Sequence, residues 1–451
     1  MLSTIRTPFV KRISISSILN RMLLFFMVFT QFYALRIKGL HISTRIILSL
    51  VGVVLFLYTA IKEQKNKGKL VIPRPIIGLG LLYLPIMIVS LISIAINGTN
   101  DLEFVKYPVS PIITIFSAYV TIAFARHIYP ELTFSKLSIY VIQIVFVQAI
   151  LSITMFYNRG FHDALYSFVE LDALEGTITR KAIGQRLLGY GANLMMLGIG
   201  NDMALLLIAI LLKDRKKQVL GPSASKFWLI FSFIFISIIG MMQARTTTLG
   251  ILFGLAYLFF PQITTFRFND FSNGLKSFGS LILYTILIAS FFLVFFPGLV
   301  KSSQSLLDYG FEMVNNYESN GKFSTGSTDI LIGMYDRYPS RLHTWVIGDG
   351  KFYNIAGDTT SLYYMGIDIG YLRLIFYFGV IGCLTYVAYQ LTFIWQSFSY
   401  LRKYYQLIPF YFIMYILFFN AKSFIDITQY VALFWVFGFY YNKQLQQQNN
   451  S

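Results

Sequence analysis

The sequence is poor in charged residues and nearly free of cysteine. Only 13% of its 451 residues are Asp, Glu, Lys or Arg, whereas hydrophobic residues make up 56%. A soluble protein typically has about 25% charged residues. The single Cys383 excludes a disulfide within the chain. This composition excludes a water-soluble fold and predicts an integral membrane protein.

The usual motifs of soluble enzymes are absent as well. The sequence has no P-loop, no dinucleotide-binding fingerprint, no HExxH and no paired CxxC. The four histidines, at positions 41, 127, 162 and 343, are scattered over both faces of the predicted topology and do not favour a histidine metal site. We expect neither metal nor cofactor, although a carboxylate site for Mg²⁺ stays an open alternative.

Apolar segments long enough to cross a membrane recur along the chain. The run 227–260 would be about 50 Å long as one helix, so we divide it at Gln243-Ala244-Arg245. The predicted fold class is an all-α polytopic membrane protein with about 12 transmembrane helices. The predicted spans are 18–35, 42–61, 76–96, 109–125, 137–157, 190–212, 227–243, 246–261, 278–298, 369–395, 405–420 and 424–441.

Charge is distributed unequally between the two sides of this topology. The side of the termini holds 21 Lys/Arg and 4 Asp/Glu, whereas the other side holds 15 of each. The net charge of +17 therefore lies on one side, as the positive-inside rule requires of a cytoplasmic face. We predict a multi-pass membrane protein with both termini on the cytoplasmic side. Nucleic acid is not an expected partner, because the basic residues follow membrane topology.

Two long loops are expected on the extracytoplasmic, periplasmic side, where loops of this length usually carry function. The second is long enough to form short helices. The predicted organisation is 1–157 (helices 1–5), 158–189 (first long loop), 190–298 (helices 6–9), 299–368 (second long loop), 369–441 (helices 10–12) and 442–451 (cytoplasmic tail).

Arginine is the functional residue that this outer face offers. A surface arginine beside an acid is often only a solvated pair. Arg245 and Arg373 differ, because charge at or below the membrane surface is costly and normally faces a polar cavity or a partner. Guanidinium groups bind phosphate oxygens in pairs and keep their charge, which favours a lipid-linked diphosphate substrate. The outer arginines are Arg159, Arg180, Arg186, Arg245, Arg337, Arg341 and Arg373.

Four segments resemble one family. RKAIGQRLLGYG runs from Arg180 to Gly191, and RYPSRLHTWVIG runs from Arg337 to Gly348, one in each long loop. They are similar to the RX10G pair of Wzy-type O-antigen polymerases, which are related to O-antigen ligases. The segments ARTTTLG, around Arg245, and DIGYLRLIFYFGVIG, from Asp368, are similar to helix-start patterns of that family.

The resemblance implies a GT-C-like glycosyltransferase of a bacterial inner membrane that polymerises undecaprenyl-diphosphate-linked oligosaccharides into O-antigen or a related polysaccharide. Arg180 and Arg337 correspond to the motif arginines. Membrane lipids and a chain-length regulator protein are further expected partners. Residues expected to help bind the diphosphate are Arg186, Arg245, Arg341 and Arg373.

A general base must take the proton of the acceptor hydroxyl. The candidates, all in or beside the second long loop, are His343, Asp336, Asp358 and Asp368. His343 is the only histidine in either motif segment, and the related ligases use a loop histidine. Its alternatives are a partly buried histidine bonded to backbone and a cationic phosphate ligand. Helix capping accounts equally well for Asp368. Asp202, inside a predicted helix, is expected to bond between helices rather than to catalyse.

Two rival functions stay open at this point. An O-antigen ligase shares the expected fold and transfers to lipid A-core instead of to a repeat unit. A lipid-linked oligosaccharide flippase, or another transporter, is expected to carry its charges at midplane and to show inverted repeats. The concentration of charge in long external loops favours an enzyme.

The charge asymmetry makes the topology testable. Reporters fused after Lys65, Arg215 and Lys403 are expected to report cytoplasm, and fusions within 299–368 are expected to report periplasm. Alkaline phosphatase and fluorescent-protein activity distinguish the two. A cytoplasmic signal from residue 320 contradicts the assignment.

Overall fold

The computed structural model describes residues 15–67, 74–170, 186–213, 224–260, 268–295, 298, 301, 303–355, 363–401 and 407–449. Two of the candidate residues, Arg180 and Asp358, lie outside these ranges. The described chain is mostly helical, and its strands β1 (Arg36–Ile37) and β2 (Ile42–Ser43) form one short antiparallel hairpin.

The longer helices coincide with the apolar segments of the sequence. Their bounds are α1 (Ile15–Phe32), α2 (Thr44–Lys67), α3 (Arg74–Asn97), α5 (Val109–Ile128), α6 (Phe134–Tyr157), α9 (Leu194–Lys213), α10 (Lys226–Gln243), α11 (Thr247–Phe259), α12 (Phe268–Phe295), α18 (Gly370–Ser397), α19 (Leu407–Asn420) and α20 (Thr428–Asn449). Each predicted span thus contains a helix, and the division of the run 227–260 is confirmed.

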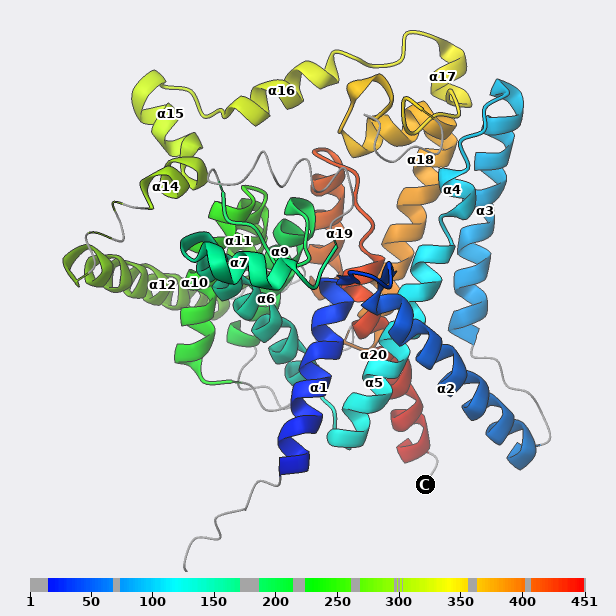
Figure 1. Cartoon of the computed structure of the whole chain (residues 1–451), viewed down its shortest axis with the longest axis horizontal. Helices are drawn as coiled ribbons and strands as arrows, with labels where there is room; N and C mark the ends of the chain where they lie inside the picture. Colours follow the sequence, from blue (N-terminus) through cyan, green and yellow to red (C-terminus); the bar gives the residue numbers. More distant parts are fainter. Residues whose placement is uncertain are drawn as a thin grey trace, which may run out of the picture.

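Short helices fill the connections. They are α4 (Glu103–Lys106), α7 (Arg159–Tyr166), α14 (Gln304–Gly310), α15 (Glu312–Asn320), α16 (Gly326–Tyr335), α17 (Leu342–Val346), η2 (Tyr364–Gly366) and η3 (Ser399–Leu401). The second long loop therefore contains short helices, as its length predicts. In Figure 1, α14–α17 lie at one end of the molecule, and the start of α1 and the end of α20 lie at the other.

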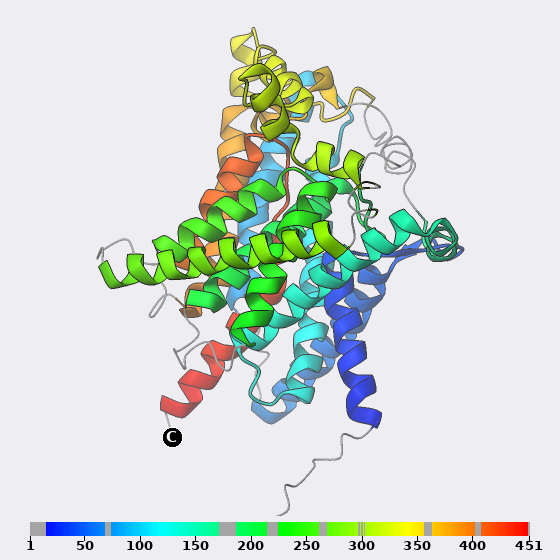
Figure 2. The same cartoon turned by 90° about the vertical axis from the view of Figure 1, so that its left-hand side faces the viewer.

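Among the described residues, eight helices are long and apolar enough to cross a membrane, and three shorter apolar helices accompany them. The chain is therefore a helical protein of membrane type, and the count of twelve crossings stays a prediction. Helix α12 lies across the direction of α1 and α3 (Figures 1 and 2).

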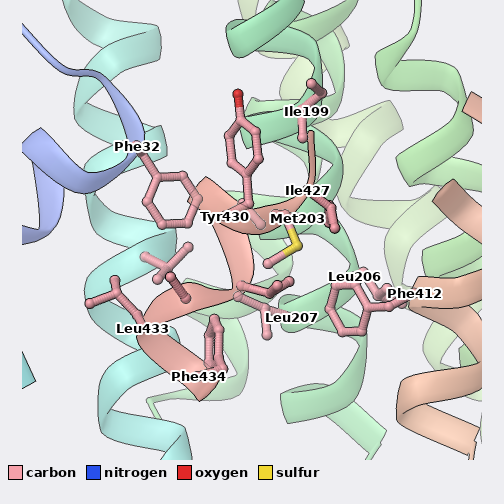
Figure 3. Close-up of a cluster of buried hydrophobic side chains, with 14 of the residues drawn as sticks. Phe32, Ile199, Met203, Leu206, Leu207, Phe412, Ile427, Tyr430, Leu433 and Phe434 are labelled. Carbon is pink, nitrogen blue, oxygen red and sulfur yellow. The ribbon is translucent and has the colours of Figure 1, made fainter. Parts of the chain in front are cut away.

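Helix α9 is the centre of the bundle and is buried on all sides. Its apolar side chains pack against α1, α19 and α20 (Figure 3). The labelled members of this cluster are Phe32, Ile199, Met203, Leu206, Leu207, Phe412, Ile427, Tyr430, Leu433 and Phe434. A helix that is apolar all round is expected in such a position.

Asp202 of α9 bonds to two other helices, which confirms the role expected from the sequence. Its carboxylate accepts from the Gly250 N–H of α11 at 3.0 Å and from the Tyr415 hydroxyl of α19 at 2.8 Å. The neighbouring Asn201 donates to Gln243 and Thr247, where α10 ends and α11 begins. The break in the long apolar run therefore lies where α9 supplies hydrogen-bond partners for the buried polar side chains at the end of α10 and the start of α11.

The second long loop returns to the bundle through a close backbone contact. Gly348, which follows α17, has φ of +82°, and a Cβ there would lie 2.5 Å from the backbone of Tyr377 and Phe378. Gly379, with φ of +70°, interrupts α18. A Cβ at this position would lie within 2.7 Å of backbone atoms of Val346 and Ile347. Only glycine fits both positions without strain.

Hydrogen bonds from α3 and its following turn hold the same loop end. Asn97 donates to the Gly348 carbonyl at 2.9 Å, and Thr99 donates to the Gly350 carbonyl at 2.8 Å. The buried carboxylate of Asp101 accepts from the Phe352 N–H at 2.8 Å. The glycine of the second RX10G segment thus marks where the loop joins the bundle.

Gly348→Ala is expected to loosen this loop end. The left-handed conformation and the lack of space together cost on the order of 2–4 kcal/mol of local stability. Limited proteolysis of the detergent-solubilised protein measures the effect as faster cleavage within 336–355. Gly333→Ala is the control, because a Cβ at Gly333 of α16 meets nothing within 4 Å. Equal cleavage rates for the two variants contradict the role of Gly348.

Candidate functional site

Two arginines from different parts of the chain share one aromatic ring. The guanidinium carbon of Arg186 lies 4.7 Å from the centre of the Tyr309 ring, and that of Arg245 lies 4.6 Å from it. Arg245 also forms an ion pair with Glu312. Arg186, Arg245, Tyr309 and Glu312 are called the first arginine cluster below.

Local structure explains why these residues meet. Arg245 lies in the turn between α10 and α11, and the Leu187 N–H donates to the Met242 carbonyl at the end of α10, which brings Arg186 alongside. Glu312 begins α15, and its second carboxylate oxygen accepts from the Gly326 N–H at the start of α16. Glu312 therefore joins the second long loop to Arg245.

Arg373 is the centre of a second arginine cluster. Its side chain is only 5% exposed, and its guanidinium carbon lies 3.4 Å from the centre of the Tyr363 ring. Asp368 lies 3.7 Å from its Nη1 and accepts a hydrogen bond from Ser423. Within the described part of the chain the buried Nε of Arg373 has no hydrogen-bond partner.

Arg337 and Arg341 belong to the same cluster from its exposed side. Arg337 donates to the Met365 carbonyl at 3.3 Å. Arg341 precedes α17 and acts electrostatically on Tyr364, whose pKa is raised by burial and by Asp349 and lowered by Arg341. The short segment 363–366 thus interacts with three arginines. Tyr363 contacts Arg373, the Met365 carbonyl accepts from Arg337, and Tyr364 feels the charge of Arg341.

Lys422, in the turn between α19 and α20, lies between the two clusters. Burial lowers its pKa, the charge of Arg245 lowers it further, and Asp202 and Asp368 raise it. Partial burial raises the pKa of Asp368, whereas Arg373, Ser423 and Lys422 lower it. These mutual effects place Arg245, Lys422, Asp368 and Arg373 in one electrostatic neighbourhood.

Positive charge exceeds negative charge over this neighbourhood. The cations are Arg186, Arg245, Arg337, Arg341, Arg373 and Lys422, and the carboxylates that act on them or on their partners are Glu103, Asp202, Glu312, Asp349 and Asp368. The guanidinium groups of Arg186 and Arg245 both contact Tyr309 and repel each other. Glu312 pairs with Arg245 alone, so the charge of Arg186 is not offset in the same way. An anion with several oxygens, such as a diphosphate, would satisfy the remaining charge and donors.

The structure separates the proposed bases. Asp368 lies beside Arg373, and its carboxylate binds Ser423 instead of capping α18. His343 on α17 and Asp336 at the end of α16 are exposed, and within the described residues neither side chain forms a hydrogen bond or ion pair. Asp358 lies outside the described residues, as does the motif residue Arg180.

Sequence reasoning missed several members of the site. Lys422 carried a signal, because it is a lone lysine in a short connection on the side expected to be poor in Lys and Arg. Tyr309 and Glu312 carried none, since tyrosines and acids are common in the long loops.

Comparison with known proteins adds no relative. No family model, curated protein or solved structure matches this chain.

Proposed function

We propose that this chain is a GT-C-like glycosyltransferase that polymerises undecaprenyl-diphosphate-linked oligosaccharide units into O-antigen or a related polysaccharide, at the periplasmic face of the inner membrane. The observation that carries the proposal is the gathering of arginines from both long loops and from the starts of α11 and α18. Arg186, Arg245, Arg337, Arg341 and Arg373 form two clusters joined by Lys422.

In the proposed reaction, an acceptor hydroxyl oxygen forms a bond to the anomeric carbon of the donor sugar. The bond from that carbon to the phosphate oxygen breaks, and the diphosphate leaves with the electron pair. The arginines and Lys422 stabilise the charge that develops on the leaving group, and electrostatic stabilisation of this kind often contributes more to catalysis than any other effect. Undecaprenyl diphosphate is released, and the polymer grows by one transfer.

Asp368 is the base that this geometry favours. It is half exposed, lies 3.7 Å from Arg373, and is the candidate carboxylate within the cationic neighbourhood. In the proposed step it takes the proton of the attacking hydroxyl. A base of this kind contributes about 10²- to 10⁴-fold to the rate.

The distribution of charge argues against a transporter. The clusters lie at helix ends and in loop helices, whereas the charged Asp202 within the bundle bonds to α11 and α19. A transporter is expected to present its charges to a central cavity at midplane.

Loss of the protein is expected to leave lipid A-core that carries a single repeat unit, because ligation and flipping still operate. Loss of a ligase or a flippase leaves bare core instead. Gel banding of lipopolysaccharide from a deletion strain, with and without complementation, distinguishes these results. Bare core that complementation restores to polymer contradicts the polymerase proposal.

Asp368 makes the reaction dependent on pH in a defined direction. A base must be deprotonated, so the rate falls as pH drops through the pKa of Asp368. Lys422→Gln removes a charge that lowers the pKa of Asp368, so the acidic limb of the rate profile is expected to move to higher pH.

In vitro polymerisation with the reconstituted protein, measured against pH, tests this shift. Lys322→Gln is the control, because Lys322 is an exposed lysine of the second long loop. This change is expected to leave the pH profile in place. Asp368→Asn is expected to lower the rate by roughly 10²-fold or more. An Asp368→Asn variant of wild-type rate removes Asp368 from the reaction.

A further inference from the structure

A cavity of about 510 Å³ lies beside the second arginine cluster. Its wall includes Arg45 at the start of α2, Glu103 and Lys106 of α4, and Asp426 in the turn before α20. Aromatic side chains, among them Phe424, complete the wall. This volume lies in the range of ordinary small-molecule sites, which are lined by aromatic residues and a few polar groups.

The polar groups of the cavity are held by the bundle. Arg45 donates to the Gln31 carbonyl at 2.8 Å and to Gln429 at 3.2 Å. Asp426 accepts from the Thr428 N–H at 2.8 Å and from Gln390 at 3.4 Å. Side chains fixed in this way do not need to be ordered when a ligand binds, which favours affinity.

The charge of the cavity differs from that of the arginine clusters. Arg45 and Lys106 are matched by Glu103 and Asp426, so cations and carboxylates are equal in number. Two carboxylates in the wall repel a phosphate but accept strong hydrogen bonds from hydroxyl groups. The lining therefore suits a neutral ligand with many hydroxyl groups and an apolar ring face, which is the chemistry of a sugar.

The cavity and Arg373 share two aromatic side chains. Phe352 and Phe424 line the cavity, and the guanidinium carbon of Arg373 lies 4.1 Å and 5.4 Å from the centres of their rings. A sugar in the cavity would therefore lie against the two rings that also contact Arg373, which is not itself part of the wall. This is the relation expected between an acceptor sugar and a donor diphosphate.

We propose that this cavity binds the terminal sugars of the acceptor, with Glu103 and Asp426 accepting hydrogen bonds from their hydroxyl groups. The proposal rests on the glycosyltransferase function proposed above and adds to it the subsite for the acceptor. Glu103 and Asp426 are assigned to binding, and the proton of the attacking hydroxyl still passes to Asp368.

The test uses the full-length protein in lipid nanodiscs and two separate probes. The first probe is the repeat-unit oligosaccharide released by mild acid from the lipid-linked pool of the host strain, without lipid or phosphate. The second is farnesyl diphosphate, which has the diphosphate and no sugar. Calorimetry measures the dissociation constant of each.

Glu103→Gln and Asp426→Asn are each expected to weaken oligosaccharide binding about tenfold, because each removes a charged hydrogen-bond acceptor. Ser110→Phe, a change at the rim of the cavity, is expected to weaken it by filling the space. Asp426→Asn and Ser110→Phe keep the affinity of the wild type for farnesyl diphosphate. Glu103→Gln keeps or strengthens it, because Glu103 is a negative charge that acts on Arg373. Retained diphosphate binding also shows that the three variants are folded. Glu318→Gln, on the exposed face of α15, is the matched control and changes neither affinity.

Arg245→Gln completes the design, since it is expected to weaken farnesyl diphosphate binding and to leave the oligosaccharide affinity unchanged. Unchanged oligosaccharide affinity in all three cavity variants overturns the subsite, whereas a single-unit lipopolysaccharide band in the deletion strain would still support the polymerase. If native mass spectrometry shows instead that the cavity variants lose bound phosphatidylglycerol, the cavity holds a lipid headgroup and the sugar subsite is wrong.

Discussion

The carboxylate of Asp101 is the contact on which the second long loop and the site both depend. This side chain is 1% exposed, and its oxygens accept from the backbone N–H groups of Glu103 and Phe352. The Tyr377 hydroxyl of α18 donates to its carbonyl at 2.6 Å. A buried carboxylate without donors is costly, so the carboxylate of Asp101 holds α4 and the loop end together, and its backbone carbonyl adds the bond to α18. The same residue thereby orients Glu103, Phe352 and the helix that carries Arg373.

Most of the helices could be predicted, because a helix that crosses the hydrocarbon layer must be long and apolar. Such a helix is recognisable in the sequence as a long run of apolar residues. Each predicted span contains a helix, and the break after Gln243 is where the sequence places it. The direction of α12 could not be predicted, since composition indicates that a segment is apolar without indicating how it lies. The count of crossings depends on that direction, and so it stays a prediction.

The candidate site, like the arrangement of helices, could be predicted only in part. Arg245 and Arg373 could be predicted as site residues, because a charge at or below the membrane surface is costly and normally faces a polar cavity or a partner. Both side chains are largely buried. Two of their partners were harder to predict, because Tyr309 and Lys422 approach them from segments that are distant in the sequence. The RX10G spacing also has two separate physical meanings. Gly348 allows the backbone contact with α18, whereas Arg337 lies exposed on the preceding turn.

The separation of a cationic region from a charge-balanced cavity bears on a problem of the proposed reaction. Donor and acceptor would both carry undecaprenyl diphosphate, so recognition of the diphosphate alone cannot assign their roles. A charge-balanced site whose carboxylates accept hydrogen bonds from sugar hydroxyl groups can, because it favours the sugar end of a substrate over the diphosphate. Phe352 and Phe424 form the boundary between the two environments and contact Arg373 on its aromatic side. Under the proposed function, the chain whose sugar end enters the cavity would be the acceptor. The chain whose diphosphate lies at the arginine clusters would be the donor, and this would set the direction of transfer.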